Sequence, residues 1–337
     1  MCAEPRLVPR FALTGLPAGH KRFASLCSGG SGMRASRAVI GNRIGVVLCL
    51  LYLMIGCQPQ QVVKPEKPAV TSPRTTEELI TFVERAAALV QARGSEAFPE
   101  LGRRPSVWSH DDTYLFIAEA GTNRIVVHGA DRSRLGADLT TIKGAEGRSF
   151  GRWGLEALAT RDHAWIFYKR ARPAGGAPVW KASYLKRVET SSGESYIVGS
   201  GVYDLKVDRR FVTELVDMAV ARLQEDGRAA LKLVRERDGP FVYMQTQVFV
   251  INTRGDVLAD PLYPELERKN QINLKSADGR PIQRDLIQLI QTESAGWQTG
   301  YLWPRPYGGK AGHKDIYMRR VQVGRQTLGV GSGLYVD

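Results

Sequence analysis

Two short segments of the chain place a lysine three residues before a tyrosine, Lys181-Ala-Ser-Tyr184 and Lys314-Asp-Ile-Tyr317. A lysine ammonium compensates the charge of a carboxylate, and a tyrosine hydroxyl donates a hydrogen bond while its ring adds to an apolar wall. Each segment is followed by a Gly-Ser-Gly segment that ends in a further tyrosine, Tyr203 or Tyr335. These residue types are suited to holding a small anionic ligand.

The residue types that most often carry out catalysis are missing from most of the chain or are poorly spaced. From Gln58 to Asp337 there is no cysteine, which excludes a disulfide, a CxxC pair, a thiolate metal site and a cysteine nucleophile in that part. The five histidines are not spaced as metal ligands on a helix, and no GxSxG segment is present. The Gly-Ser-Gly segments lack the Lys-Ser/Thr ending of a phosphate-binding loop. The sequence therefore predicts no catalytic residue, no metal site, no cofactor and no enzyme activity.

The chain has 337 residues and a formal net charge of +13. Residues 1–56 hold seven of the 47 basic residues and one of the 34 acidic ones, which leaves 40 basic and 33 acidic residues, or +7, from residue 57 on. These charges are spread out, without a run of like charges or a nucleic-acid-binding motif. We therefore expect no nucleic-acid partner, and a mildly basic surface that favours anionic small ligands or lipid headgroups.

The N-terminal residues have the features of an export signal. Three arginines precede Ile44–Ile55, an apolar run that is too short to span a bilayer but suits the core of a signal peptide. The run ends in Leu-Met-Ile-Gly-Cys, residues 53–57, which resembles a bacterial lipobox and makes Cys57 the predicted lipidation site. Ordinary export with cleavage elsewhere is the alternative. Met33 is the natural start of such a signal.

A proline-rich segment, residues 57–74, follows this signal. Its prolines are Pro59, Pro65, Pro68 and Pro73. Proline favours extended, semi-rigid spacers, so we expect a tether between a lipid anchor and a folded domain. Gln58 follows the cysteine, which by resemblance to Gram-negative lipoproteins favours the outer membrane. The sequence thus predicts a lead and lipoprotein signal peptide over 1–56, and a mature protein anchored on the periplasmic face of a bacterial membrane in the cell envelope.

The remainder of the chain repeats one order of elements. Amphipathic helices are predicted after Thr75 and near Phe211, and each precedes two short strands, a second helix and three longer strands. The short strands and second helices are predicted at Thr113–Ala118, Ile125–His128 and Ser149–Thr160, and again at Gln245–Ile251, Asp256–Ala259 and Arg284–Thr292. Landmarks such as Lys181 and Lys314 lie 133 positions apart. So long an offset indicates a duplicated domain, and the element order predicts an α+β unit with one antiparallel sheet.

The order of these motifs resembles the single Cache domain, type 2, a PAS-like extracytoplasmic sensor of bacterial chemoreceptors and histidine kinases. The first copy carries it in Tyr168-x4-Pro173, Lys181–Tyr184 and Gly199–Tyr203, and the second in Gly296–Pro306, Lys314–Tyr317 and Gly331–Tyr335. The resemblance implies tandem PAS-like (Cache) modules at 75–206 and 207–337, each an antiparallel sheet of about five strands with a long N-terminal helix.

Two positions depart from the family pattern. The first copy has Arg170 where the pattern prefers tryptophan, and the second has Ile316 where it prefers serine. The two copies therefore need not bind the same ligand, and one of them is expected to be a structural partner.

The resemblance also implies a ligand pocket between the sheet and the segments that cover it, and the family often binds short carboxylates such as acetate, pyruvate or lactate. The predicted ligand-binding residues are Trp165, Tyr168, Lys181, Tyr184 and Tyr203 in the first copy, and Trp297, Tyr301, Trp303, Lys314 and Tyr335 in the second. Because successive residues of a strand face opposite sides, Lys181 and Tyr184 cannot both line one pocket. The alternative for each aromatic residue is packing in the core.

These observations predict an extracytoplasmic lipoprotein that binds or senses a small molecule, a short carboxylate or similar metabolite. Its expected partners are this ligand, the membrane through the lipid anchor, and a separate membrane receptor, histidine kinase or transporter. The alternative is a scaffold or interaction lipoprotein whose modules bind no ligand.

Overall fold

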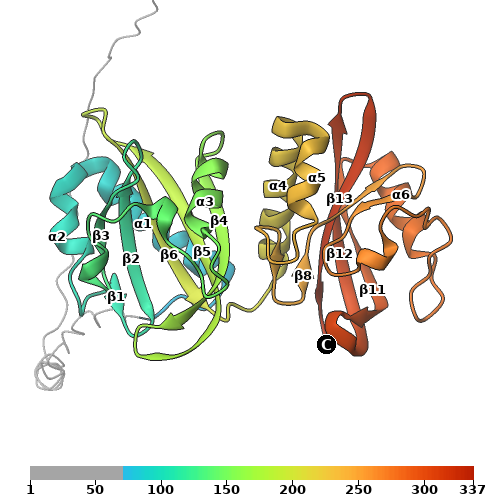
Figure 1. Cartoon of the computed structure of the whole chain (residues 1–337), viewed down its shortest axis with the longest axis horizontal. Coiled ribbons are helices and arrows are strands. Elements are labelled where there is room, and N and C mark those ends of the chain that lie inside the picture. Colours follow the sequence, from blue (N-terminus) through green and yellow to red (C-terminus); the bar gives the residue numbers. More distant parts are fainter. Residues whose placement is uncertain (1–70) are drawn as a thin grey trace, which may run out of the picture. The chain divides into compact units, whose positions relative to one another are not determined.

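A computed structural model describes residues 71–337 of the protein (Figure 1). The predicted signal peptide, the predicted lipidation site Cys57 and most of the predicted tether lie outside the described residues. Within residues 71–337, no helix is long and apolar enough to cross a bilayer.

The described residues form two large antiparallel sheets, each with helices on both faces, and one separate two-stranded sheet. The helices are α1 (Thr76–Arg93), α2 (Phe98–Leu101), α3 (Phe150–Leu158), α4 (Arg209–Asp226), α5 (Ala230–Val234) and α6 (Ile282–Thr292). The strands up to residue 203 are β1 (Ser109–His110), β2 (Thr113–Glu119), β3 (Ile125–His128), β4 (His163–Arg172), β5 (Gly175–Glu189) and β6 (Ser195–Tyr203). The later strands are β7 (Val242–Tyr243), β8 (Thr246–Gln247), β9 (Phe249–Asn252), β10 (Val257–Ala259), β11 (Ala295–Arg305), β12 (Gly309–Val323) and β13 (Gln326–Tyr335).

The two sheets share one strand order. The first runs β2-β6-β5-β4, with β3 and the two-residue β1 both paired to β2, and the second runs β10-β9-β13-β12-β11. All these pairs are antiparallel. This arrangement confirms the predicted fold class, two α+β modules with sheets of about five strands and a long helix before each. We call residues 75–206 the first module and 207–337 the second, with the boundary between them kept as predicted.

The long helices α1 and α4 begin and end in the same way. At the start of α1, the side chain of Thr75 accepts a hydrogen bond from Glu78 N (3.2 Å), and the Glu78 carboxylate accepts one from Thr75 N (3.1 Å), which is the predicted capping box. At the start of α4, the Asp208 carboxylate accepts a backbone hydrogen bond at 2.8 Å. Both helices end at a glycine with positive φ, Gly94 (55°) and Gly227 (60°).

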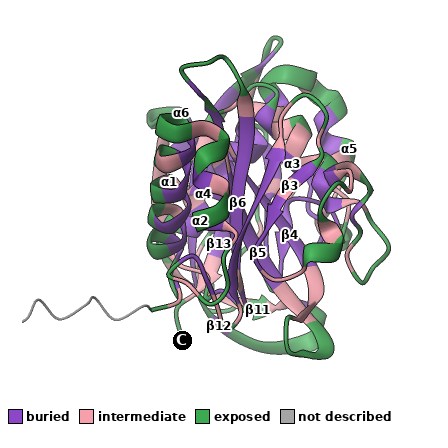
Figure 2. Ribbon diagram, turned by 90° about the vertical axis from the view of Figure 1, so that its left-hand side faces the viewer, coloured by how far each residue is buried: buried purple, intermediate pink, exposed green. Residues whose placement is uncertain are grey.

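The apolar faces of these helices form the core. Buried side chains of α1, among them Leu79 and Val83, pack against β5 and β6, and those of α4 pack against β12 and β13. The shorter helices α3 and α6 cover the opposite faces of the two sheets. Figure 2 shows the result, with buried residues concentrated in the strands and exposed residues on the outer faces of the helices. Helices therefore cover both faces of each sheet, and side chains between a sheet and its helices can enclose a ligand on either face.

One predicted strand is wrong in its extent. The structure divides Gln245–Ile251 between β8, which pairs with β7, and β9, which joins the second sheet. Met244 has a positive φ of 54°, and the tight β7–β8 hairpin takes Thr246 and Gln247 out of the sheet. This division brings the side chain of Gln247 to a cavity in the second module.

Candidate functional site

Lys181 on β5 and Lys314 on β12 occupy equivalent positions in the two sheets. Each lies opposite a tyrosine on both neighbouring strands, Tyr168 and Tyr203 for Lys181, and Tyr301 and Tyr335 for Lys314. The two lysines are only 1 % and 2 % exposed. Among residues 71–337, no hydrogen bond or salt bridge joins either ammonium group to an acceptor, and burial lowers the pKa of each lysine to about 8. A buried ammonium without an acceptor is costly, so both positions suit an anion supplied from outside the chain.

The Gly-Ser-Gly segments leave room for these lysines. A β-carbon at Gly201 on β6 would lie 2.2 Å from Ser183 Oγ and 2.6 Å from Lys181 Cε, and one at Gly333 on β13 would lie 2.9 Å from Lys314 Cε. Such distances are shorter than van der Waals contact, so any larger residue would displace the lysine. The second glycine of each segment therefore leaves room for the lysine side chain that crosses the neighbouring strand.

In the second module, Lys314 lines a cavity between the sheet and α6. The cavity volume is about 40 Å³, and about 450 Å³ when all the space between atoms that opens to solvent is included. Its wall is mostly apolar, with Phe249, Ile251 and Leu286 among its residues, and the polar groups are few, chiefly Gln247, Asp260 and Lys314. A mostly apolar cavity with a few convergent polar groups is typical of a small-molecule site.

Asp260 is the second charged group of this cavity. It is 5 % exposed, and its Oδ1 accepts hydrogen bonds from Gln247 Nε2 (3.2 Å), Leu262 N (3.2 Å) and Tyr263 N (3.1 Å). Burial raises the pKa of Asp260 to about 6, although the charge of Lys314 and these hydrogen bonds oppose the rise. The cavity therefore presents one carboxyl group, which is held in place through its Oδ1, and one ammonium without a hydrogen-bonding partner.

Aromatic side chains close one end of the cavity. The hydroxyls of Tyr263 and Tyr335 both donate to Pro304 O, at 2.6 and 2.7 Å, and lie 3.1 Å from each other. The ring of Trp303 meets that of Tyr263 edge to face, with centroids 5.9 Å apart. The Lys314 ammonium lies 5.2 Å from the Tyr335 ring centre and 5.8 Å from that of Tyr263. These contacts stabilise a cation while leaving its hydrogen bonds unused.

The structure brings together only some of the residues predicted for the second module. Lys314 and Trp303 line the cavity, and Tyr335 lies beside Lys314. Tyr301 is fully buried on the same face but bonds to Asp285 on α6 (2.8 Å) rather than lining the cavity.

The grouping of Trp297 with these residues is wrong. Its ring packs on Tyr317 and under the Arg209 guanidinium, on the face covered by α4. A bulge in β11 causes this, because Gln298 and Tyr301, three residues apart, pair with residues only two apart on β12. The extra residue turns Trp297 and Tyr301 to opposite faces.

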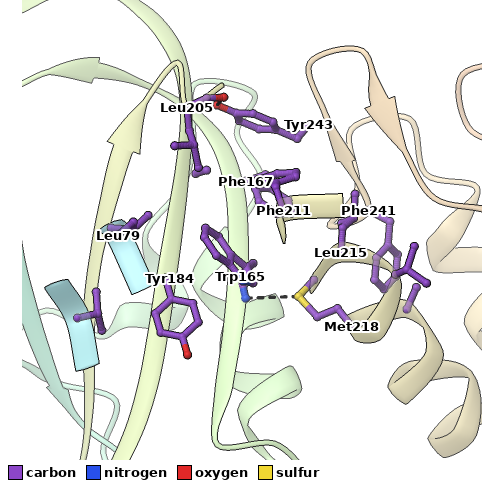
Figure 3. Packing of buried hydrophobic residues seen from close by; sticks show 14 of the residues in the cluster. Leu79, Trp165, Phe167, Tyr184, Leu205, Phe211, Leu215, Met218, Phe241 and Tyr243 are labelled. Atoms are coloured by element: carbon purple, nitrogen blue, oxygen red, sulfur yellow. Dashed lines mark hydrogen bonds between the residues drawn. The ribbon is translucent and has the colours of Figure 1, made fainter. Parts of the chain in front are cut away.

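In the first module, Tyr168, Lys181 and Tyr203 share one face of the sheet. Trp165 and Tyr184 lie on the other face and are not part of a site with Lys181. Trp165 is 1 % exposed and packs edge to face on Tyr184, with ring centres 5.2 Å apart (Figure 3). The alternative interpretation, core packing, therefore describes these two side chains.

In the first module, side chains partly fill the space that corresponds to the cavity of the second module. The ring of Phe150, from α3, stacks on Tyr168 with centroids 3.6 Å apart, and Tyr168 Oη lies 3.2 Å from Ser183 Oγ. An open cleft remains at the outer end, lined by Tyr114, Tyr203 and several basic residues.

Sequence motifs did not indicate Asp260, Gln247 or Tyr263. Asp260 follows β10 directly and lies 132 positions after His128, so the repeat offset alone could have paired these two residues. Gln247 lies in the segment that was predicted as a continuous strand. When a loop brings a residue to a cavity, the spacing of residues along the sequence does not identify that residue as a ligand contact.

The second module is thus an α+β domain whose antiparallel sheet carries a lysine-containing cavity under a helix. Residues 221–335 match the family model described as Single Cache domain 2. The first module repeats its strand order. No curated protein matches the chain.

Several solved structures are similar to parts of the chain. A Cache chemosensory domain described as recognising carboxylic acids is 22% identical, with 38% of this chain and 92% of that one covered and a TM-score of 0.33. A methyl-accepting chemotaxis protein from Vibrio parahaemolyticus RIMD 2210633 is 19% identical, with 38% and 88% covered and a TM-score of 0.31. The ligand-binding domain of the amino acid chemoreceptor PctC of Pseudomonas aeruginosa PAO1, in complex with GABA, is 12% identical, with 77% and 90% covered and a TM-score of 0.29.

Proposed function

We propose that the second module binds a small organic carboxylate, and that the protein is an extracytoplasmic ligand-binding or sensing lipoprotein that acts with a separate signalling partner. The observation that carries this proposal is the Lys314 ammonium, which faces a largely apolar cavity without an acceptor among the described residues. The match of residues 221–335 to the Single Cache domain 2 model supports the same class of function.

The arrangement of the cavity indicates which part of a ligand goes where. A carboxylate next to Lys314 would receive a charge-assisted hydrogen bond, which is stronger than one between neutral groups. The remainder of the ligand would lie against Phe249, Ile251 and Leu286, where burial of each methylene contributes about 0.8 kcal/mol. The preferred ligand is therefore a short carboxylate with an apolar tail.

Titration calorimetry of the full-length chain with a panel of short carboxylates, from acetate to valerate, tests the proposal. Lys314→Met keeps the length and apolar stem of the side chain but removes its charge, and we expect it to weaken carboxylate binding by about tenfold or more. Arg325→Gln is the control, because Arg325 lies in the exposed turn between β12 and β13. Equal affinity of the wild type and Lys314→Met would contradict the site.

The scaffold alternative makes the opposite prediction. If neither module binds a ligand, no carboxylate, amino acid or amine will raise the melting temperature, because only a ligand of the native state stabilises it. A reproducible protein partner without any ligand response would favour that alternative.

The lipoprotein part of the proposal is supported by residues 53–57 and the apolar run before them. The mass of the mature N-terminal peptide tests it: a diacylglyceryl-modified Cys57 is expected, and Cys57→Ser should release the protein from the membrane fraction. Cleavage elsewhere with an unmodified N-terminus would contradict lipidation without affecting the proposed ligand site.

A further inference from the structure

A cleft in the first module differs in charge from the cavity of the second. It is lined by strand and loop residues near the ends of β2, β4 and β6, and holds about 990 Å³ of space between atoms, part of it open to solvent. Five of its lining residues are basic, Arg134, Lys143, Lys169, Arg170 and Arg172, and one is acidic, Asp131. The excess of positive charge makes the cleft attractive to anions.

Partners within the chain neutralise part of this charge but not all of it. Arg134 pairs with Asp131 (3.2 Å), and Arg172 pairs with Asp112 and Asp204. The Lys169 ammonium lies over the Trp180 ring, 5.2 Å from its centre.

Two basic side chains of the cleft have no such partner. Within the described range, neither Arg170 nor Lys143 forms a side-chain hydrogen bond or an ion pair. Arg170 is half-buried and Lys143 is exposed, and they come from different elements that meet at the cleft. They are therefore available to a ligand.

Lys181 adds a third positive charge at the base of the cleft. Its ammonium lies 3.8 Å from the ring centre of Tyr114 and 4.4 Å from that of Tyr203, and both rings line the cleft. Lys181 is 1 % exposed and has no acceptor among residues 71–337. An anion in the cleft would offset a buried charge that the chain itself leaves uncompensated.

The register of the two sheets shows that a basic residue, Arg170, replaces Trp303 and that a histidine, His128, replaces the carboxyl group of Asp260. Arg170 lies two residues after Tyr168, as Trp303 lies two residues after Tyr301, and these tyrosines face the equivalent lysines. His128 pairs with Phe116 on β2, and Asp260 occupies the corresponding place beside Phe249. The second cavity thus carries one ammonium and one carboxyl group, whereas the first module has no carboxyl group at the equivalent position.

His128 contributes a neutral donor or acceptor rather than a further charge. Its ring stacks on Tyr114 with centroids 4.9 Å apart, and Nδ1 accepts a hydrogen bond from Asp131 N (3.0 Å). Burial lowers its pKa to about 4, with the nearby Arg170 and Lys181 adding to the effect. The fixed positive charge near neutral pH therefore comes from Arg170, Lys143 and Lys181.

From this geometry we propose that the cleft of the first module binds a small anion with at least two negative charges, a dicarboxylate or a phosphate. The proposal extends ligand binding to the first module and assigns it a ligand of different charge from the one proposed for the second. Arg170 and Lys143 contact the anion, and Lys181 stabilises it through the tyrosine-lined base of the cleft. A monocarboxylate uses only part of this charge and binds more weakly there.

Titration calorimetry of the full-length chain at low salt, with succinate and inorganic phosphate as dianion probes and acetate as the monoanion, tests this proposal. We expect binding of at least one dianion, weakened about tenfold by Arg170→Gln and several-fold by Lys143→Gln. Higher salt should weaken it because the site is open to solvent. A response to succinate alone, or to phosphate alone, identifies which of the two dianion chemistries the cleft takes.

Three variants separate this site from the second module and from general surface charge. Arg170→Lys keeps a positive charge and should retain most of the dianion affinity, provided that its melting temperature matches the wild type. Arg325→Gln removes one exposed charge from the second module and should have no effect. Lys314→Met should leave dianion binding intact while it weakens carboxylate binding.

Three outcomes would overturn the proposal. The first is the absence of dianion binding at millimolar concentration. The second is equal weakening by Arg170→Gln and Arg325→Gln, which would indicate non-specific attraction. The third is loss of dianion binding in Lys314→Met with retention in Arg170→Gln, which would move the ligand to the second module and leave the proposed function there standing.

Discussion

At the scale of single residues, the protonation of two buried lysines depends on the group that lies next to them. Lys314 has the Asp260 carboxyl group within electrostatic range, whereas the rings of Tyr114 and Tyr203 surround Lys181. Burial lowers the pKa of both lysines to about 8, so each is mostly charged at pH 7 but titrates within an accessible range. Ligand binding and stability therefore both respond to pH in ways that can be measured.

Carboxylate binding to the second module should weaken as the pH rises above 8. The ligand prefers the protonated Lys314, whose pKa in the free protein is about 8, so the affinity at pH 9 should be about tenfold lower than at pH 7. Calorimetric titration at pH 6 to 9.5 measures this dependence, with Lys314→Met as the variant that should lack it.

The dependence of affinity on pH below 7 distinguishes a simple carboxylate from a ligand that also carries an ammonium group. Asp260, with a pKa raised to about 6 by burial, loses its charge below that pH. A simple carboxylate should then bind no more weakly, because a repelling charge has gone. A fall in affinity between pH 6.5 and 5 would instead show that a ligand ammonium pairs with Asp260, and would contradict a simple carboxylate ligand.

Lys181→Met should stabilise the ligand-free protein at pH 7. Folding transfers the Lys181 ammonium to a site without an acceptor, and its pKa falls from 10.5 to about 8, so the gain can reach about 3 kcal/mol, less the lost contacts with two tyrosine rings. Urea unfolding of both proteins at pH 7 and pH 9.5 measures the free energy of unfolding.

The pH dependence provides the check on that variant. Because the folded pKa lies below the unfolded value, the unfolded state binds the extra proton between pH 8 and 10, and the stability of the wild type should rise through this interval. The part of that rise due to Lys181, on the order of 2 kcal/mol by pH 9.5, should be missing in Lys181→Met. Parallel profiles for the two proteins would show that Lys181 is not desolvated in solution.

At the scale of elements, the sequence predicted the order of helices and strands better than the faces of individual side chains. Periodicity and capping residues located α1 and α4, and strand alternation correctly separated Lys181 from Tyr184. The same alternation failed at Trp297, because the bulge before Tyr301 adds one residue to β11. A bulge depends on the pairing with a neighbouring strand, so the sequence of one strand does not reveal it.

The sequence predicted the residues of the candidate site that lie on strands of the sheet, but not those that reach it from other elements. Lys314 and Trp303 project from strands of the sheet and line the cavity as predicted, although their role as ligand contacts stays a prediction. Asp260 and Phe150, by contrast, reach the two sites from a loop and from α3. Long-range packing sets their positions, and no local pattern encodes it.

Replacing Gly333 by alanine tests why the Gly-Ser-Gly segment contains no larger residue at this position. The new β-carbon would lie 2.5 Å from the backbone oxygen of Asp315 and 2.9 Å from Lys314 Cε, so we expect a loss of about 1–3 kcal/mol in stability and weaker carboxylate binding. Thermal unfolding and calorimetry measure the two effects. Gly121→Ala is the matched control, because nothing lies within 4 Å of a β-carbon there. If both variants behave as the wild type does, the glycine is not required for packing.

At the scale of the whole described unit, α4 connects the two modules. It packs against β12 and β13, and its outer face contacts β4 of the first sheet, where Phe211 lies 5.2 Å from Phe167 between ring centres and Met218 Sδ accepts a hydrogen bond from Trp165 N (3.3 Å; Figure 3). One buried apolar cluster therefore includes residues of both modules. A change in either module that shifts α4 would therefore also change the packing of the other module.

A histidine at the contact between β4 and α4 should make the stability contributed by this contact depend on pH. His163 Nε2 on β4 lies 3.2 Å from the Glu214 carboxylate on α4, and Nδ1 lies 2.7 Å from that of Asp162, while the Arg161 guanidinium lies 2.9 Å from Nε2. The hydrogen bond to Glu214 is the largest cause of a raised His163 pKa, with burial opposing it. Because the folded pKa is above the unfolded value, the stabilisation is fully present below pH 6.5 and is lost as the pH rises through the raised pKa.

His163→Gln should therefore cost about 1 kcal/mol of stability at pH 6 and less at pH 8.5, because the stabilisation by the charged histidine decreases as the pH rises through its raised pKa. Denaturant unfolding at the two pH values measures the difference. His313→Gln is the control for removal of a histidine as such, since His313 is exposed and lies 3.8 Å from Asp337, away from the contact between β4 and α4. Equal destabilisation by His163→Gln at both pH values would mean that packing, rather than charge, accounts for the effect. It would leave the apolar contacts of Phe211 and Met218 as the connection between the modules.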